Sequence, residues 1–229
     1  DLHSFPTRRS SDLLSYNRPE MESEAGRDVD AVLTTREAAR LFRLKNIDLA
    51  QFPDEEFDSF MGEGTGAARI FGTTGGVMEA ALRTVVWKLT GGAVDQIDYT
   101  VARGYKGVKE ASLMVGDLEV KVAVVNGIGN VKAVMDDVRA GKSPYHFIEV
   151  MACPGGCLNG GGAPLVKEPK SVAERMAKMY ESDAKNPVRR SHENKEVQAL
   201  YEEYLKEPCG HLSHHLLHTT YVDRSGEVK

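Results

Sequence analysis

Apolar residues recur with helical spacing at two places in the first half of the chain. Thr34 and Glu37 have the spacing of a capping box, so a helix is predicted to run through residues 35–46. A Gly/Thr loop over 70–76 leads into a second predicted helix at 77–90. The apolar face that this helix is expected to bury consists of Val77, Ala81, Leu82, Val85 and Leu89.

Strand-like apolar runs follow at residues 96–102, 108–115 and 118–125. Gly116 and Asp117 join the last two runs and suit a two-residue turn, which predicts an antiparallel hairpin. A predicted helix over 131–140 and an apolar strand over 146–152 complete a βαβ unit, whose two strands run parallel. The predicted fold class is therefore α/β, with a mixed, partly parallel sheet flanked by helices.

The pattern becomes purely helical after the stretch Pro164–Pro169, which predicts a boundary and an all-helical C-terminal tail. Helices are expected over 171–184 and 189–208, with Ser191 as the N-cap of the second. We divide the chain into residues 1–16, 17–165 and 166–229. The first part has no apolar period and carries an Arg/Ser cluster, so we expect it to be a non-native leader from adapter or vector sequence.

Composition narrows the classes of partner. The 229 residues are 41% hydrophobic with a net charge of −5, which gives no electrostatic reason to expect nucleic acid or a membrane surface. No apolar stretch approaches the roughly 20 residues of a membrane helix, and arginines stand where a secretory signal would be apolar. Three cysteines are too few for a disulfide framework and indicate a reducing compartment, so a cytoplasmic location is predicted.

Two of the cysteines, Cys153 and Cys157, lie just beyond the predicted strand at 146–152, where open α/β sheets usually bind ligands. Glycines occupy the loop around them at positions 155, 156, 160, 161 and 162. Thiolates are soft ligands for zinc, Cu(I) or iron–sulfur clusters, and glycines let backbone approach a bulky anionic group. A structural zinc site, a dithiol redox pair, or buried thiols beside a turn that needs glycine are the alternatives.

The stretch FIEVMACPGGCLNGGGAP, residues 147–164, resembles the third cysteine motif of the iron-only (FeFe) hydrogenases, E-x-M-x-C-x-x-G-C-x-x-G-G-G-Q-P. Residues 65–83 resemble the glycine loop and helix beside that family's catalytic pocket, and residues 28–41 resemble the segment after its second cysteine motif. Residues 189–205 and 215–221 resemble a helical tail that some members carry as a separate small subunit. The resemblance covers about residues 18–221.

The resemblance implies a site and a reaction. Cys153 would ligate a cubane 4Fe–4S cluster, and Cys157 would ligate it and bridge to a two-iron unit with CO, cyanide and dithiolate ligands, together the H-cluster. Phe71 and Met151 would line the pocket over the two-iron unit, and Gly72 would bring backbone close to its ligands. The implied activity is reversible oxidation of H2 to protons and electrons, with ferredoxin or an NADH-linked carrier as redox partner.

Two departures from the family pattern matter. Ala163 replaces the glutamine of the motif, which slightly favours a sensory hydrogenase. The two upstream cysteine motifs are absent from the chain, so the N-terminal remainder of the same protein is an implied partner. We therefore predict that this chain does not hold a stable active cluster by itself. The alternative from another class is a cluster-carrying relative that acts in cytosolic iron–sulfur protein assembly.

Other polar residues receive simpler interpretations. Glu149 is expected to satisfy a backbone or basic partner rather than to move protons, and His192 is expected to be structural. A group at the C-terminal end could be drawn as a metal site, although caps and interface hydrogen bonds explain it more simply. That group is Cys209, His211, His214, His215 and His218.

Overall fold

The computed structural model describes residues 22–56, 63–104, 106–164 and 169–218. Its strands are β1 (Glu22–Ser23), β2 (Gly26–Arg27), β3 (Val108–Val115), β4 (Leu118–Asn126) and β5 (Phe147–Met151). Its α-helices are α2 (Thr35–Leu44), α3 (Gly66–Ile70), α4 (Gly76–Leu89), α5 (Val131–Arg139), α6 (Pro169–Ala184), α7 (Lys195–Leu200) and α8 (His211–Leu217). Short 3-10 turns are η2 (Leu49–Gln51), η3 (Thr100–Ala102), η4 (Ile128–Asn130), η5 (Cys157–Asn159) and η6 (Ser191–Glu193), and α7 continues into a π-helical turn, η7 (Tyr201–Leu205). The predicted leader lies outside the described residues.

The sheet has the predicted mixed topology. Strands β3 and β4 pair antiparallel down to Val115 and Leu118, and Gly116 in the turn adopts φ +61°, a conformation that favours glycine. Strand β5 joins β4 in parallel, from Val122 opposite Phe147 to Asn126 opposite Met151, after the crossover through α5. The prediction of an α/β fold with a partly parallel sheet and a helical C-terminal region is confirmed.

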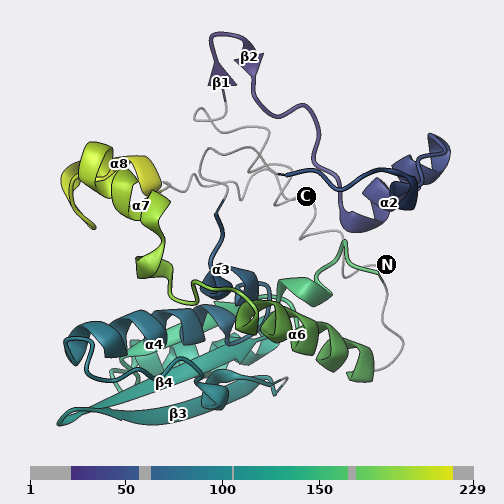
Figure 1. Ribbon diagram of the computed structural model, residues 1–229. Helices are drawn as coiled ribbons and strands as arrows, with labels where there is room; N and C mark the ends of the chain where they lie inside the picture. Colours follow the sequence, from purple (N-terminus) through teal and green to yellow (C-terminus); the bar gives the residue numbers. More distant parts are fainter. Residues whose placement is uncertain (1–21, 57–62, 105, 165–168, 219–229) are drawn as a thin grey trace.

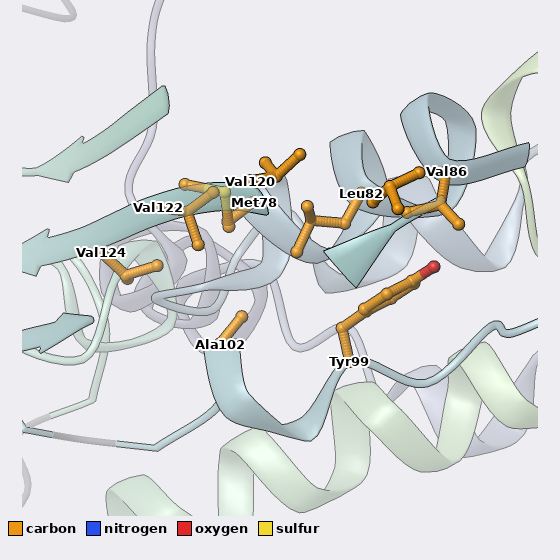
Figure 2. Packing of buried hydrophobic residues seen from close by; sticks show 9 residues of the cluster. Met78, Leu82, Val86, Tyr99, Ala102, Val120, Val122 and Val124 are labelled. Carbon is orange, nitrogen blue, oxygen red and sulfur yellow. The ribbon is translucent and has the colours of Figure 1, made fainter. Parts of the chain in front are cut away.

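Helix α4 lies along one face of the β3–β4 hairpin, and the hydrophobic core lies between them (Figure 1). Met78, Leu82 and Val86, spaced four residues apart, point toward the sheet. Figure 2 shows them facing apolar side chains of β4 and of the segment before β3. Those side chains are Val120, Val122, Val124, Tyr99 and Ala102.

The predicted apolar face of α4 was right at Leu82, which is buried in the core, and wrong at Val85 and Leu89. Val85 and Leu89 are 41% and 57% exposed, whereas the buried stripe begins at Met78. The physical reason is that α4 also buries a polar pair, Glu79 and Arg83, both 0% exposed. Apolar spacing alone cannot indicate a buried face that includes charges.

The predicted strand over 96–102 does not form. Its backbone bonds to side chains of α4 instead of to a neighbouring strand: the Tyr99 N–H donates to Glu79 Oε1 at 3.3 Å, and Arg83 Nε donates to the Ile97 carbonyl at 2.8 Å. The segment then ends in the 3-10 turn η3. Because these backbone groups already have side-chain partners, they do not need to pair with a neighbouring strand.

The helix caps were predicted with mixed success. The capping box at α2 is present, with Thr34 and Glu37 bonded reciprocally, as predicted. Ser191, predicted as the N-cap of the last long helix, begins η6 instead. Asn194 caps α7, because its Oδ1 accepts the Val197 N–H at 3.1 Å.

Candidate functional site

The cysteine loop, residues 152–164, leaves the carboxyl end of β5 as the sequence predicted. The N–H groups of Gly127 and Ile128 donate to the carbonyls of Met151 and Ala152, at 2.9 and 3.1 Å. Asn126, buried at the end of β4, accepts the Gly155 N–H on its Oδ1 at 3.0 Å. The end of the sheet therefore holds the start of the loop through two backbone bonds and one bond to the Asn126 side chain.

The two thiols have different surroundings. Cys153 is half-buried, whereas Cys157, which begins η5, is exposed. Burial raises the pKa of the Cys153 thiol, the nearby Cys157 raises it further, and the Gly161 N–H directed at the sulfur opposes both effects. An N–H group aimed at sulfur stabilises a thiolate, which is the form that ligates metal.

A second loop, residues 71–75, packs against the cysteine loop and is called the glycine–threonine loop below. The Leu158 N–H donates to the Gly72 carbonyl at 3.0 Å, and the Thr74 N–H donates to the Gly155 carbonyl at 3.0 Å. Phe71, the C-cap residue just after α3, is 46% exposed. The structure thus brings Gly72 and the cysteine loop into direct contact, and places Phe71 on the surface of the same loop.

The two loops approach each other closely at Gly156. It adopts φ +97°, and a Cβ added there would lie 2.7 Å from the Thr74 nitrogen and 2.8 Å from the Gly72 oxygen. The missing side chain therefore makes room for neighbouring backbone at this position. Gly160 lies beside the thiols instead of the second loop. A Cβ added there would lie 4.0 Å from the Cys153 sulfur and 3.0 Å from the Cys157 carbonyl oxygen.

We expect Gly156→Ala to destabilise the protein by about 2 kcal/mol, because both the positive φ and the contact with rigid backbone oppose a methyl group. Urea denaturation of the purified chain measures this cost. Gly129→Ala is the matched control, since a Cβ there meets nothing within 4 Å and needs no positive φ. Equal stability of the two variants would contradict the proposed packing of the loops.

Glu149 has a structural role, as predicted from the sequence. It is 5% exposed, and its two oxygens accept the N–H groups of Gly75 and Met78 at 2.6 and 2.7 Å, which fixes the N-terminus of α4. Burial raises the pKa of this carboxyl, and the two backbone bonds oppose the rise. The carboxylate thus joins β5 to the glycine–threonine loop and the start of α4.

Three basic residues near the loops were missed by the sequence analysis. Lys109 donates to the carbonyls of Ala102, Gly104 and Thr74, and burial lowers its pKa to about 8. Arg36 and Arg175 donate to carbonyls of the cysteine loop. No local sequence signal indicates these contacts, because each partner lies far along the chain or in a loop.

Among the remaining predicted residues, Met151 lies close to the thiols in sequence, whereas the histidines make contacts elsewhere. Met151 ends β5, two residues before Cys153. His192 bonds the Thr84 hydroxyl through Nδ1 at 2.9 Å and stacks on Trp87. The rings of His214 and His218 lie 4.3 Å apart, and no set of three or more His, Cys, Asp or Glu side chains in the described part of the chain is arranged to hold a metal ion.

The two thiols are the type of ligand that an iron–sulfur cluster takes, but they are fewer than a cluster needs. Two thiols project from one glycine-rich loop, and a backbone N–H points at one of the sulfurs. A cubane takes four ligands, and the residues that the structure describes supply two thiols in this loop. None of the described helices is both long and apolar enough to cross a bilayer. The fold thus defines an α/β protein whose cysteine loop presents two free thiols, half the number of thiolates that a cubane takes.

Comparison with known proteins identifies the class to which this protein belongs. Residues 15–161 match the model of the family "Iron only hydrogenase large subunit, C-terminal domain", and residues 169–224 match "Iron hydrogenase small subunit". The chain therefore belongs to the iron-only hydrogenase family.

Individual relatives agree with this assignment. The chain is 57% identical over 149 residues to the periplasmic Fe hydrogenase large subunit of Nitratidesulfovibrio vulgaris, covering 65% of the chain and 35% of the relative. It is 47% identical over 208 residues to the NADP-reducing hydrogenase subunit HndD of Solidesulfovibrio fructosivorans, covering 90% of the chain and 35% of the relative. The chain thus spans about a third of the length of these curated relatives.

More distant and structural matches complete the comparison. A cytosolic iron–sulfur assembly component of Rattus norvegicus is 33% identical, over 91% of the chain and 44% of that protein. A solved FeFe-hydrogenase from Chlamydomonas reinhardtii superposes with a TM-score of 0.71 at 37% identity, covering 94% of the chain and 61% of the solved one.

Proposed function

We propose that this chain is the C-terminal part of an FeFe-hydrogenase and supplies two of the cysteine ligands of its H-cluster. The whole protein then catalyses reversible oxidation of H2 to protons and electrons. The observation that carries the proposal is the pair Cys153 and Cys157 in a glycine-rich loop at the carboxyl end of β5. Membership of the hydrogenase family supports the choice of an iron–sulfur cluster over zinc or a redox dithiol.

The residue roles follow from this proposal. Cys153 would hold the cubane and Cys157 would hold both the cubane and the two-iron unit, while Phe71, Gly72 and Met151 would line the pocket. When bound, the cluster supplies the redox chemistry of hydrogen. The protein's own part is to fix the two sulfurs, to orient the glycine–threonine loop beside them and to limit access of water.

The other ligands are proposed to come from the remainder of a longer protein, because four thiolates are needed and this loop provides two. By itself the 229-residue chain is proposed to be inactive. The proposed electron partner is ferredoxin or a nicotinamide-linked carrier; the NADP-reducing relative supports the second choice. The cytoplasmic location stays a prediction, since one relative is named periplasmic and others cytosolic.

The full-length protein, matured anaerobically with the cluster-assembly machinery, is expected to evolve H2 from a reduced carrier. The 229-residue chain treated in the same way is expected to show no turnover. Gas chromatography of the headspace, together with iron analysis, measures both. A full-length protein that is loaded with iron but inactive would contradict the hydrogenase proposal.

That contradicting outcome would favour a second candidate, a cluster-carrying protein of iron–sulfur assembly. Relatives with this name are 30–33% identical to the chain over about nine tenths of its length. The test of this candidate measures transfer of the cluster from the protein to apo-protein targets, in place of H2 production.

A further inference from the structure

We propose that Arg175, on α6, is a positioning residue that fixes Leu158, the residue following Cys157, and thereby the direction of that thiol. The inference rests on the proposed function, in which Cys157 is a cluster ligand. It goes further by assigning a task in the metal site to the helical region that matches the small subunit, residues 169–224.

The contacts of Arg175 span the cysteine loop. Its Nη1 donates to the carbonyl of Leu158 at 3.1 Å, and its Nη2 donates to the carbonyl of Pro164 at 2.9 Å. These carbonyls stand immediately after Cys157 and at the end of the loop. One planar guanidinium therefore joins both points and closes the loop around its glycines.

Leu158, the residue after Cys157, is held through both of its backbone polar groups. The Leu158 N–H donates to the Gly72 carbonyl at 3.0 Å, while the Leu158 carbonyl accepts from Arg175. Cys157 itself is exposed, so packing of its side chain does not set its direction. The backbone of the turn sets it instead. The Cys157 carbonyl accepts the Gly160 N–H at 2.9 Å, Leu158 is bonded to Gly72, and Arg175 adds the one of these bonds that comes from the tail.

The next turn of α6 packs against the glycine–threonine loop. Met179, one turn after Arg175, lies 3.0 Å from the position of a Cβ added to Gly72. The next residue, Tyr180, shares a 3.3 Å hydrogen bond with the Thr73 hydroxyl. Helix α6 thus contacts the cysteine loop through Arg175 and the glycine–threonine loop through the following turn, which makes the arginine part of a continuous contact surface.

The first test is hydrogen exchange on the purified 229-residue chain without metal. Arg175→Lys keeps the charge but loses the fork, so the amides of Leu158 and Gly160 are expected to exchange about tenfold faster, as loss of one or two hydrogen bonds implies. The control is Lys178→Gln on the same helix, since Lys178 pairs with Glu181 and bonds no loop carbonyl. Equal exchange in the two variants at equal urea midpoints would overturn the proposal.

The second test uses the full-length, cluster-loaded protein. Arg175→Lys is expected to change the g-values or line width of the reduced cluster's electron paramagnetic resonance signal, whereas Lys178→Gln leaves the signal unchanged. An unaltered signal in the lysine variant would overturn the positioning role. If the wild-type protein holds no cluster at all, the proposed function fails, and the exchange experiment still decides whether Arg175 holds the loop.

Discussion

Replacing Cys157 with serine in the full-length protein is expected to remove the iron-dependent spectroscopic signal and to lower H2 turnover by more than about 100-fold. A hydroxyl is a harder and much less acidic ligand than a thiol and does not replace a bridging thiolate. The loss of activity should exceed the roughly 10- to 100-fold loss that follows when residues hydrogen-bonded to metal ligands are changed. Iron content, electron paramagnetic resonance and H2 evolution measure the effect.

Cys209→Ser is the matched control for this experiment. Cys209 is a free, exposed thiol in the turn before α8, outside the cysteine loop. The control is expected to retain iron, signal and activity. A Cys157→Ser protein that keeps the wild-type signal would show that the loop does not carry the cluster, and the interpretation of the glycine-rich motif would fail with it.

Asp183→Ala is expected to lower the free energy of unfolding by about 3–5 kcal/mol and the Tm by roughly 10 °C. Asp183 is 0% exposed and accepts hydrogen bonds from Nη1 and Nη2 of Arg83, at 2.8 and 2.7 Å. It also pairs with Arg189 at 2.6 Å. Removing the carboxylate leaves the fully buried Arg83 paired with Glu79 alone. An incompletely compensated buried charge is among the most costly defects in a protein interior.

Glu181→Ala on the same helix is the control for urea denaturation. Glu181 makes two ion pairs, with Lys178 and Lys185, and all three side chains are exposed, so the expected change is within about 0.5 kcal/mol. If the alanine variant of Asp183 does not fold, Asp183→Asn retains the shape and one hydrogen-bond acceptor and gives a measurable intermediate loss. Equal stability of the Glu181 and Asp183 variants would contradict a role for the network.

The acid response of the protein provides an independent check. Burial raises the pKa of Asp183, but the bonds from Arg83 and Arg189 outweigh it, so the pKa is held below its usual value of 3.8. The unfolded chain then takes up a proton first, and this contribution to stability is lost as the pH falls from about 4 through the lower folded-state pKa. The Asp183→Asn variant should show a flatter decline over this range.

This ion-pair network also bears on how the two matched regions fit together. Glu79, Arg83 and Arg103 belong to the region that matches the large subunit, whereas Asp183 and Arg189 belong to the region that matches the small subunit. The network crosses the boundary predicted at residues 165–166. Helix α6 is therefore joined to α4 by buried charges as well as by its contacts with the loops.

Local chemistry allowed part of the structure to be predicted from the sequence. The hairpin at Gly116, the capping box at Thr34 and the βαβ unit each depend on residues close together in the chain, and the structure contains all of them. The cysteine loop was located at the end of β5 for the same reason: strand and motif are adjacent. Its resemblance to the hydrogenase motif needed only the order and type of residues.

Tertiary structure decided the rest, because the partners are far apart in sequence. The buried face of α4 includes Arg83, whose partner Asp183 lies 100 residues away in the sequence. The segment 96–102 forms hydrogen bonds to α4 instead of a strand. The same holds for Arg175, which reaches back to Leu158 across the boundary between the two regions. Hydrogen bonds from charged side chains to distant carbonyls and carboxylates produce no repeating pattern in the sequence. Only the folded structure therefore shows them.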